Sequence, residues 1–280
     1  MTAIAPKRSM WREISASYAF VERNFNMTKR YWGWEMVWLI YSIANALAIT
    51  YIGAGTEAIS GVKINVPYLV LYLLIGSLVW GYLSMVFHSI SEVVAWERWE
   101  GTIEYTFMAP ISRLTHLIGQ TIYSVIYGLM FTCVIFLVVT LFFRLNLAGA
   151  NLLGALAALA AGSVSFIGFG IMASVLPLLY PERGAQMTHV FEALLLLVSG
   201  VYYPVSVLPR WIQSVARVSP ATYALESMRA ALLDHAGWGA LLPNIGLLLA
   251  MGLVTIPAGL FIFKRAERYA KRSGRLKRTG

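Results

Sequence analysis

The sequence predicts an all-α integral membrane protein with six transmembrane helices. Of its 280 residues 59% are hydrophobic and only 12% are charged, whereas soluble domains have about 45–50% apolar and about 25% charged residues. About 20 apolar residues cross the hydrocarbon layer of a membrane. Six segments reach or approach this length: residues 33–53, 66–91, 115–142, 148–176, 188–204 and 241–263.

Residues 9–31 precede the first span and predict a helix that lies on the membrane surface. Apolar side chains repeat there at spacings of three and four, which places them on one face of a helix. An aromatic face with basic flanks is typical of interfacial helices. No secretory signal precedes this segment, so we expect the first span to stay in the mature protein. The apolar face consists of Trp11, Ile14, Tyr18, Val21 and Phe25.

The distribution of basic residues predicts the orientation. Six spans place both termini on one side, and most of the 22 Lys and Arg residues fall on that side. Cytoplasmic segments collect Lys and Arg, so we expect a multi-pass protein of the plasma (inner) membrane with cytoplasmic termini. Topology and anionic lipid then explain the net charge of +9 better than nucleic acid does. The predicted parts are an arm and interface helix (1–31), a six-helix transmembrane domain (32–264) and a basic tail (265–280).

A polar, amphipathic stretch separates the second and third spans, W-E-R-W-E-G-T-I-E-Y-T-F-M-A-P-I-S-R from 96 to 113. It predicts a short cytoplasmic helix at about 95–110, with an apolar stripe opposite an acidic one. Such a helix either lies passively among the lipid headgroups or gives a soluble partner a contact through which to move the spans. The apolar stripe consists of Trp96, Trp99, Ile103 and Phe107, and the acidic stripe consists of Glu97, Glu100 and Glu104.

Residues 204–235 predict a re-entrant helical hairpin on the outer side. Pro204, Pro209 and Pro220 divide this stretch into two short helices, about 209–217 and 221–234. Helices too short to span must pack against protein or line a cavity when they lie at membrane depth. Glu226 and Arg229 are three residues apart, and we expect them to form a local ion pair that orients the hairpin.

Two spans have distinctive side chains. Small residues at every fourth position, Ala150, Gly154, Ala158 and Gly162, predict a helix-packing seam. The span at 66–91 instead contains aromatic residues, which either contact a cargo or belong to the interfacial belts and the core. The candidates for a cargo pathway are Tyr68, Tyr72, Trp80 and Phe87, with Tyr202 and Tyr203 from the hairpin.

Catalytic motifs are absent from the sequence. Without a Gly-Lys dipeptide there is no P-loop, so we expect no ATP site and no cofactor on this chain. Cys133 is the sole cysteine, which excludes an internal disulfide. His88 with Glu92, and His189 with Glu192, lie one helical turn apart, but a metal enzyme usually assembles more ligands, so we expect no metal site. His116 and His235 are expected to face water.

Carboxylates near the inner ends of spans are expected to be paired, because a charge at mid-bilayer costs roughly 2.5–3.5 kcal/mol. The three residues concerned are Glu35, Glu92 and Glu192. They either pair with Lys29, Arg30 or Arg183 in structural ion pairs or gate a cytoplasmic entrance.

Two stretches resemble type-2 ABC transporter permeases. E-R-W-E-G-T-I-E-Y-T-F-M-A-P is similar to that family's Glu-x-Gly-Thr-x-Glu…Pro stretch, and V-S-P-A-T-Y-A-L-E-S-M-R resembles its Pro-x-x-Tyr-Ala-Leu-Glu-x-x-Arg signature. The resemblance implies a half-transporter: two six-span subunits paired around a path, with two copies of a separate ATPase bound below. ATP and Mg²⁺ would bind to that ATPase. The matching coupling-helix contacts are Glu97, Glu100, Gly101, Thr102, Glu104, Tyr105 and Pro110.

The expected function is therefore the permease subunit of an ATP-driven exporter that works by alternating access. Drug, lipid-linked and glycan exporters share the pattern, and an aromatic, weakly charged interior suits an amphipathic or lipid-like cargo. Two alternatives stay open. One is a membrane-embedded lipid-modifying enzyme that uses the His/Glu pairs, and the other is a passive channel or scaffold.

Overall fold

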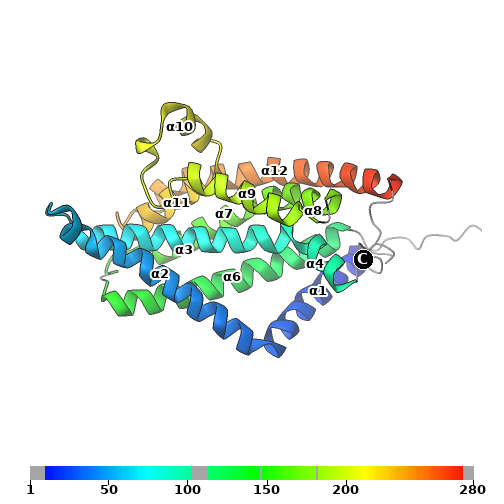
Figure 1. Ribbon diagram of the computed structural model, residues 1–280, viewed down its shortest axis with the longest axis horizontal. Coiled ribbons are helices and arrows are strands. Elements are labelled where there is room, and N and C mark those ends of the chain that lie inside the picture. Colours follow the sequence, from blue (N-terminus) through cyan, green and yellow to red (C-terminus); the bar gives the residue numbers. More distant parts are fainter. Residues whose placement is uncertain (1–9, 102–112, 146, 181, 274–280) are drawn as a thin grey trace, which may run out of the picture.

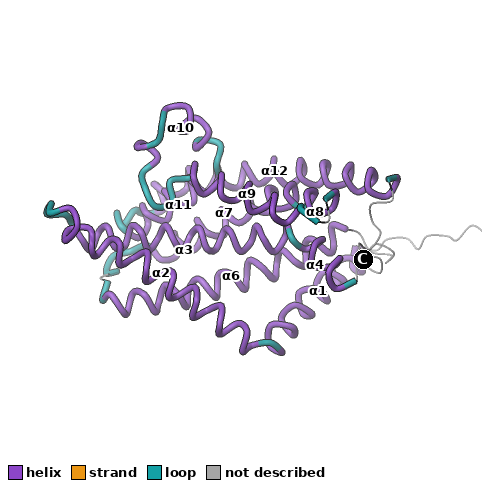
Figure 2. The backbone as a smooth tube through the Cα atoms, in the orientation of Figure 1, coloured by secondary structure: helices purple, strands orange, loops and turns teal. Residues whose placement is uncertain are grey.

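The computed structural model describes residues 10–101, 113–145, 147–180 and 182–273, and every regular element in these ranges is a helix. Figure 2 shows long helices joined by short loops, which confirms the all-helical prediction. The elements are α1 (Met10–Arg30), α2 (Trp32–Ser60), α3 (Val66–Ser91), α4 (Val93–Glu100), α6 (Arg113–Phe143), α7 (Leu152–Ala173), α8 (Val175–Leu179), α9 (Gly184–Val198), the 3₁₀ turn η1 (Val205–Val207), α10 (Arg210–Ala216), α11 (Pro220–Leu232) and α12 (Trp238–Arg272).

Five stretches among the described residues are long and apolar enough to cross a membrane. They are α2, α3, Thr115–Phe143 of α6, Leu152–Leu179 across α7 and α8, and α12. The fifth predicted span, 188–204, is instead α9, which has only 15 residues. At 1.5 Å per residue it is about 22 Å long, less than the roughly 30 Å of the hydrocarbon layer. It ends at Val198 because the chain turns at Gly200, whose φ is +70°.

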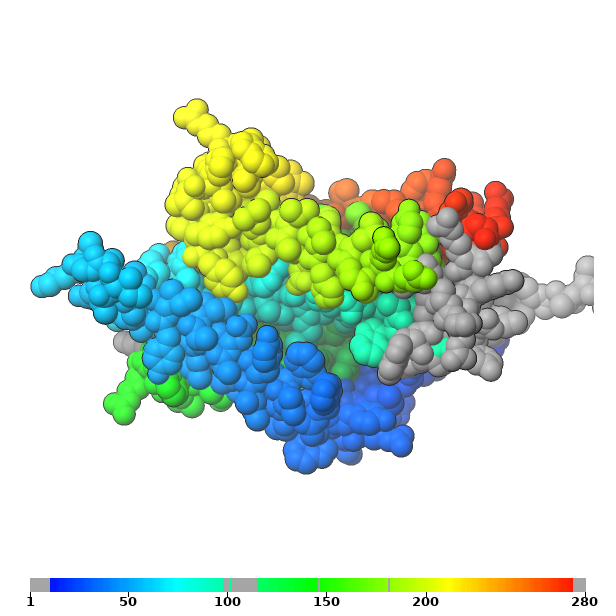
Figure 3. Space-filling model, viewed as in Figure 1, coloured from blue at the N-terminus to red at the C-terminus, as the bar shows by residue number. Residues whose placement is uncertain are grey.

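The long helices run side by side along the long axis of the molecule (Figure 1). We call the two ends of this bundle the α4 end, where α1, α4 and the end of α12 lie, and the α11 end, where α10 and α11 lie. Figure 3 shows the yellow segment around α10 rising above the rest of the surface. The predicted helices at 209–217 and 221–234 are confirmed as α10 and α11.

Two asparagines begin the most buried helices. The side chain of Asn65 accepts a hydrogen bond from the backbone of Tyr68 at the start of α3 (3.2 Å), and Asn151 accepts one from Gly154 at the start of α7 (2.8 Å). An N-cap of this kind satisfies a backbone N–H that has no partner in the helix. Asn151 also donates to the carbonyl of Ala236 after α11 (3.0 Å), so the same residue fixes α7 to the α11 end.

The predicted small-residue seam is confirmed at Gly154, which packs on α12, and at Gly162, where a Cβ would lie 3.1 Å from that of Ala224 on α11. Gly168, outside the predicted set, extends the contact with α12. A Cβ on Gly154 would lie 2.4 Å from Cδ1 of Leu241 on α12, and one on Gly168 would lie 2.2 Å from Oγ1 of Thr255. Glycine therefore lets α7 and α12 approach closely along several turns. α3 lies on the other side of α7, where the Tyr82 hydroxyl and Ser163 Oγ are 2.6 Å apart.

The first and last described segments of the chain, α1 and α12, are both helices. On α1, Ser17 donates to the carbonyl of Thr115 on α6 (3.1 Å), whereas the predicted interfacial residues Trp11 and Tyr18 stay exposed. α12 continues to Arg272, beyond the predicted end of the transmembrane domain at 264. Its last turns contain an ion pair between Lys271 and Glu267 (2.8 Å).

Candidate functional site

Two histidines and two glutamates meet near the α4 end, a group that we call the His/Glu cluster: His88, Glu92, His189 and Glu192. His88 Nε2 lies 2.5 Å from Glu192 Oε2, and its Nδ1 lies 3.4 Å from Glu92 Oε1. His189 Nε2 is 3.5 Å from Glu92 Oε1. Ser84 Oγ donates a hydrogen bond to the other oxygen of Glu192. The cluster therefore joins α3 to α9 through polar contacts.

Helical periodicity positions these side chains. Ser84 and His88 are four residues apart on α3, and His189 and Glu192 are three apart on α9, so each pair shares a face. Glu92 is the single residue between α3 and α4. The side chains of His88, Glu92 and Glu192 are 23%, 20% and 16% exposed, while His189 is 59% exposed. Three of the four side chains are thus largely shielded from solvent, and His189 is exposed.

The predicted partners of the inner carboxylates were wrong. Glu92 and Glu192 contact the histidines of the His/Glu cluster rather than Lys29, Arg30 or Arg183. Glu35 accepts a hydrogen bond from the Tyr127 hydroxyl on α6. The packing of α9 against α3 and of α2 against α6 decides these partners.

His116 was expected to face water, but it is buried at the start of α6. Its ring lies 4.6 Å from that of Phe20 on α1, and its Nε2 is 3.5 Å from Glu97 Oε1. His235 is exposed, as expected.

At the α11 end, Arg229 of α11 has a different set of partners. Its guanidinium donates to the carbonyls of Gly200 (3.1 Å) and Val201 (2.7 Å). It also stacks on the Tyr72 ring of α3, 3.6 Å from the ring centre, a favourable cation–π geometry. Burial lowers the pKa of this guanidinium, yet an arginine stays protonated in proteins.

The predicted local pair between Glu226 and Arg229 is therefore wrong. No ion pair joins these two described residues, because Arg229 points to the loop after α9 and to α3. Glu226 is exposed on α11.

The predicted cargo-pathway aromatics occupy different environments. Tyr68 is 48% exposed and stacks on Tyr72, whereas Trp80 and Phe87 are buried in the core. The Tyr203 hydroxyl donates to the carbonyl of Leu197 (2.6 Å), and Tyr202 is partly buried beside it. In the isolated chain, Trp80 and Phe87 thus serve as packing residues.

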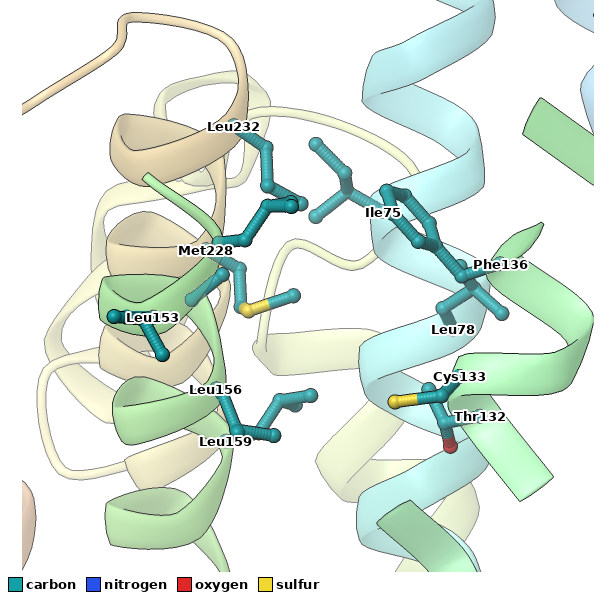
Figure 4. Close-up of a pocket in the computed structure, with 12 residues that line it drawn as sticks. Ile75, Leu78, Thr132, Cys133, Phe136, Leu153, Leu156, Leu159, Met228 and Leu232 are labelled. Atoms are coloured by element: carbon teal, nitrogen blue, oxygen red, sulfur yellow. The ribbon is translucent and has the colours of Figure 1, made fainter. Parts of the chain in front are cut away.

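An apolar cavity of about 280 Å³ lies among α3, α6, α7 and α11. Figure 4 shows Ile75 and Leu78 of α3 facing Met228 of α11 across the cavity, with Phe136 of α6 beside them. Its lining is almost entirely hydrocarbon, apart from Thr132 and Cys133. A space of this kind can hold an acyl chain or another apolar group.

The predicted coupling contacts are only partly described. Glu97 of α4 is buried while Trp96 is 56% exposed, so at these two positions the polar and apolar faces are the reverse of the predicted ones. Glu100 is the last residue of α4, and Gly101 follows it with φ +73°. Thr102, Glu104, Tyr105 and Pro110 lie outside the described residues.

These features define the class of protein: a multi-pass membrane protein made of an apolar helical bundle. The comparison with known families makes the class specific. Residues 16–233 match the ABC-2 type transporter family, and because this match covers most of the chain, the protein belongs to that family. The family match places the chain among the membrane components of ABC-2 type transporters.

One curated relative is the linearmycin resistance permease protein LnrN of Bacillus subtilis (strain 168). The chain is 28% identical to it over 97 residues, which are 35% of this chain and 25% of that protein. The chain therefore matches only about a quarter of the length of this relative, and the likeness supports the permease class without defining a cargo.

Proposed function

We propose that the protein is the permease of an ATP-driven exporter that moves an amphipathic, drug-like or lipid-like cargo out of the cytoplasm. Membership of the ABC-2 family is the observation that supports this proposal most. Because the sequence contains no P-loop, the proposal places ATP hydrolysis on a separate subunit. An enzyme or a passive channel has no comparable support.

The apolar cavity supports the choice of cargo. Its lining by α3, α7 and α11 side chains suits a hydrocarbon group better than a glycan, and the relative LnrN is named for resistance to linearmycin. Alternating access would open this space to each side of the membrane in turn, as two permease copies move against each other.

Work from the ATPase would enter through α4 and the residues that follow it. α4 continues from α3 with only Glu92 between them, so a force on α4 acts directly on a buried helix. In this proposal the α4 end faces the cytoplasm, as the basic residues there predict, and two ATPase copies bind a homodimer of the permease. α10 and α11 form the outer re-entrant hairpin.

The coupling step is tested with a Glu100→Ala/Glu104→Ala double variant, co-purified with the cognate ATPase. We expect loss of ATPase capture and of ATP-dependent export, because the variant removes the predicted contacts. Asp234→Ala removes an exposed carboxylate near the α11 end and serves as the matched control, with export unchanged. Full transport by the purified permease without any ATPase would contradict the proposal.

The cargo site is tested by filling the cavity. Leu156 lines it and is 42% exposed, so Leu156→Trp should reduce export of amphipathic antibiotics while the ATPase still binds. Leu253→Trp, at a position of α12 that is 75% exposed, is the control. Equal resistance in cells that produce either variant would exclude the cavity from the pathway.

A further inference from the structure

The His/Glu cluster contains the donor set of a transition-metal site, and we propose that His88, Glu92 and His189 bind one Zn²⁺ ion. Two imidazoles and one carboxylate are a known zinc ligand set in proteins. One ligand atom from each residue lies within 4.8 Å of the others. Because the two histidines come from α3 and α9, 101 positions apart in the sequence, only the fold brings them together.

Two of the three distances between the donor atoms agree with tetrahedral coordination, and the third is below 4.8 Å. Zinc binds nitrogen and carboxylate oxygen at about 2.0–2.2 Å, so neighbouring ligand atoms of a tetrahedron lie about 3.3–3.6 Å apart. Glu92 Oε1 lies 3.4 Å from His88 Nδ1 and 3.5 Å from His189 Nε2. Small side-chain rotations are therefore sufficient to place all three donors around one ion, with a water in the fourth position.

A second observation is the orientation of His88. Its Nδ1 is buried and makes no hydrogen bond to any described atom, although it points to the Glu92 carboxylate. Its Nε2 is held by Glu192, whose other oxygen accepts from Ser84. A metal-binding histidine usually donates its second N–H to a carboxylate in this way, which fixes the tautomer and the ring. Ser84 and Glu192 therefore act as positioning residues.

The exposure of His189 makes the site accessible to an ion, and the donor types determine which metal binds. The His189 side chain is 59% exposed while the other ligands are largely shielded, so an ion would enter from the His189 side. Imidazole favours zinc and similar metals, whereas Mg²⁺ and Ca²⁺ prefer oxygen ligands. A bound Zn²⁺ would fasten the junction of α3 and α4 to α9.

Equilibrium dialysis of the EDTA-treated, purified full chain in lipid nanodiscs against Zn²⁺ tests this site. We expect one Zn²⁺ per chain, unaffected by millimolar Mg²⁺, and Co²⁺ substitution should give the intense visible bands of tetrahedral coordination. Glu192→Gln should weaken Zn²⁺ binding by roughly 10–100-fold, the usual effect of losing a positioning carboxylate. His189→Ala should weaken it further, and His235→Ala, at an exposed histidine far from the cluster, should not.

Size-exclusion profiles and thermal midpoints measured without metal confirm that the variants fold. Wild-type protein that retains no stoichiometric Zn²⁺ would overturn the proposal, as would a folded His189→Ala variant that binds Zn²⁺ like the wild type. The test does not depend on transport, so its result is independent of the proposed export function.

Discussion

The two ends of α3 are fastened to the later part of the chain by different chemistry. At the α11 end, Arg229 binds backbone carbonyls of Gly200 and Val201 and stacks on Tyr72. At the α4 end, His88 contacts two glutamates and lies beside a second histidine. Arginine keeps its charge in proteins, whereas the neutral imidazole of histidine is a common metal ligand. The charge of the first attachment is therefore fixed, whereas the second contains side chains that are able to bind a metal ion.

The largest effect is expected from Arg229→Ala. It removes two hydrogen bonds from a charged donor and a cation–π contact, and it leaves buried carbonyls without partners. We expect a loss of about 3–5 kcal/mol in the free energy of unfolding, measured by SDS titration of the purified protein. Arg217→Ala, at an exposed arginine, should change it little, and similar losses in both variants would contradict the special role of Arg229.

The second effect concerns the close approach of α3 to the loop after α9. A Cβ on Gly76 would lie 2.1 Å from the carbonyl oxygen of Val201, whereas one on Gly81 meets nothing within 4 Å. Gly76→Ala should therefore destabilise the protein by about 1–3 kcal/mol. Gly81→Ala on the same helix should be neutral or slightly stabilising. The same unfolding titration compares the two variants, and equal stability would exclude a tight contact at Gly76.

A loss smaller than that of Arg229→Ala is expected at the α4 end. Glu192→Ala removes the acceptor of both His88 and Ser84, which should cost about 1–3 kcal/mol. Since His88 keeps Glu92 as a neighbour, this loss should stay below that of Arg229→Ala in metal-free buffer. A loss at least as large as that of Arg229→Ala would remove the contrast between the two ends.

The smallest effect is expected from Ser84→Ala, which deletes one hydroxyl and leaves the His88–Glu192 contact in place. A loss of about 0.5–1.5 kcal/mol is typical of a single hydrogen bond. Ser89→Ala is the control, because its hydroxyl bonds only to the carbonyl of Val86 within α3. Unchanged stability and unchanged Zn²⁺ affinity in Ser84→Ala would show that Ser84 does not position Glu192.

Local patterns in the sequence predicted most helices correctly. Apolar length predicted α2, α3, α6, α7 and α12, and the prolines predicted the breaks around α10 and α11. Each of these signals acts within a few turns of the chain. The apolar run also led to the wrong prediction of a span at 188–204. It does not reveal the turn near Gly200 at which α9 ends.

Partners between helices could not be predicted in this way. The sequence shows Glu226 three residues from Arg229, but it does not show which face of α11 meets Tyr72. Similarly, the His/Glu cluster forms only when α3 and α9 are turned so that their His and Glu side chains face each other. Tertiary packing decides that orientation. The signal that was available is the repeated His/Glu spacing at 88/92 and 189/192, since polar residues at membrane depth tend to face one another.

The near-continuity of α3 and α4 has a mechanical consequence. A helix of 26 residues is about 39 Å long, so a pivot of about 5° at Glu92 would move its far end by about 3 Å. That shift is comparable with the distance between the Arg229 guanidinium carbon and the centre of the Tyr72 ring, 3.6 Å. A small rotation received on one side of the membrane would therefore be amplified into the opening or closing of a contact on the other.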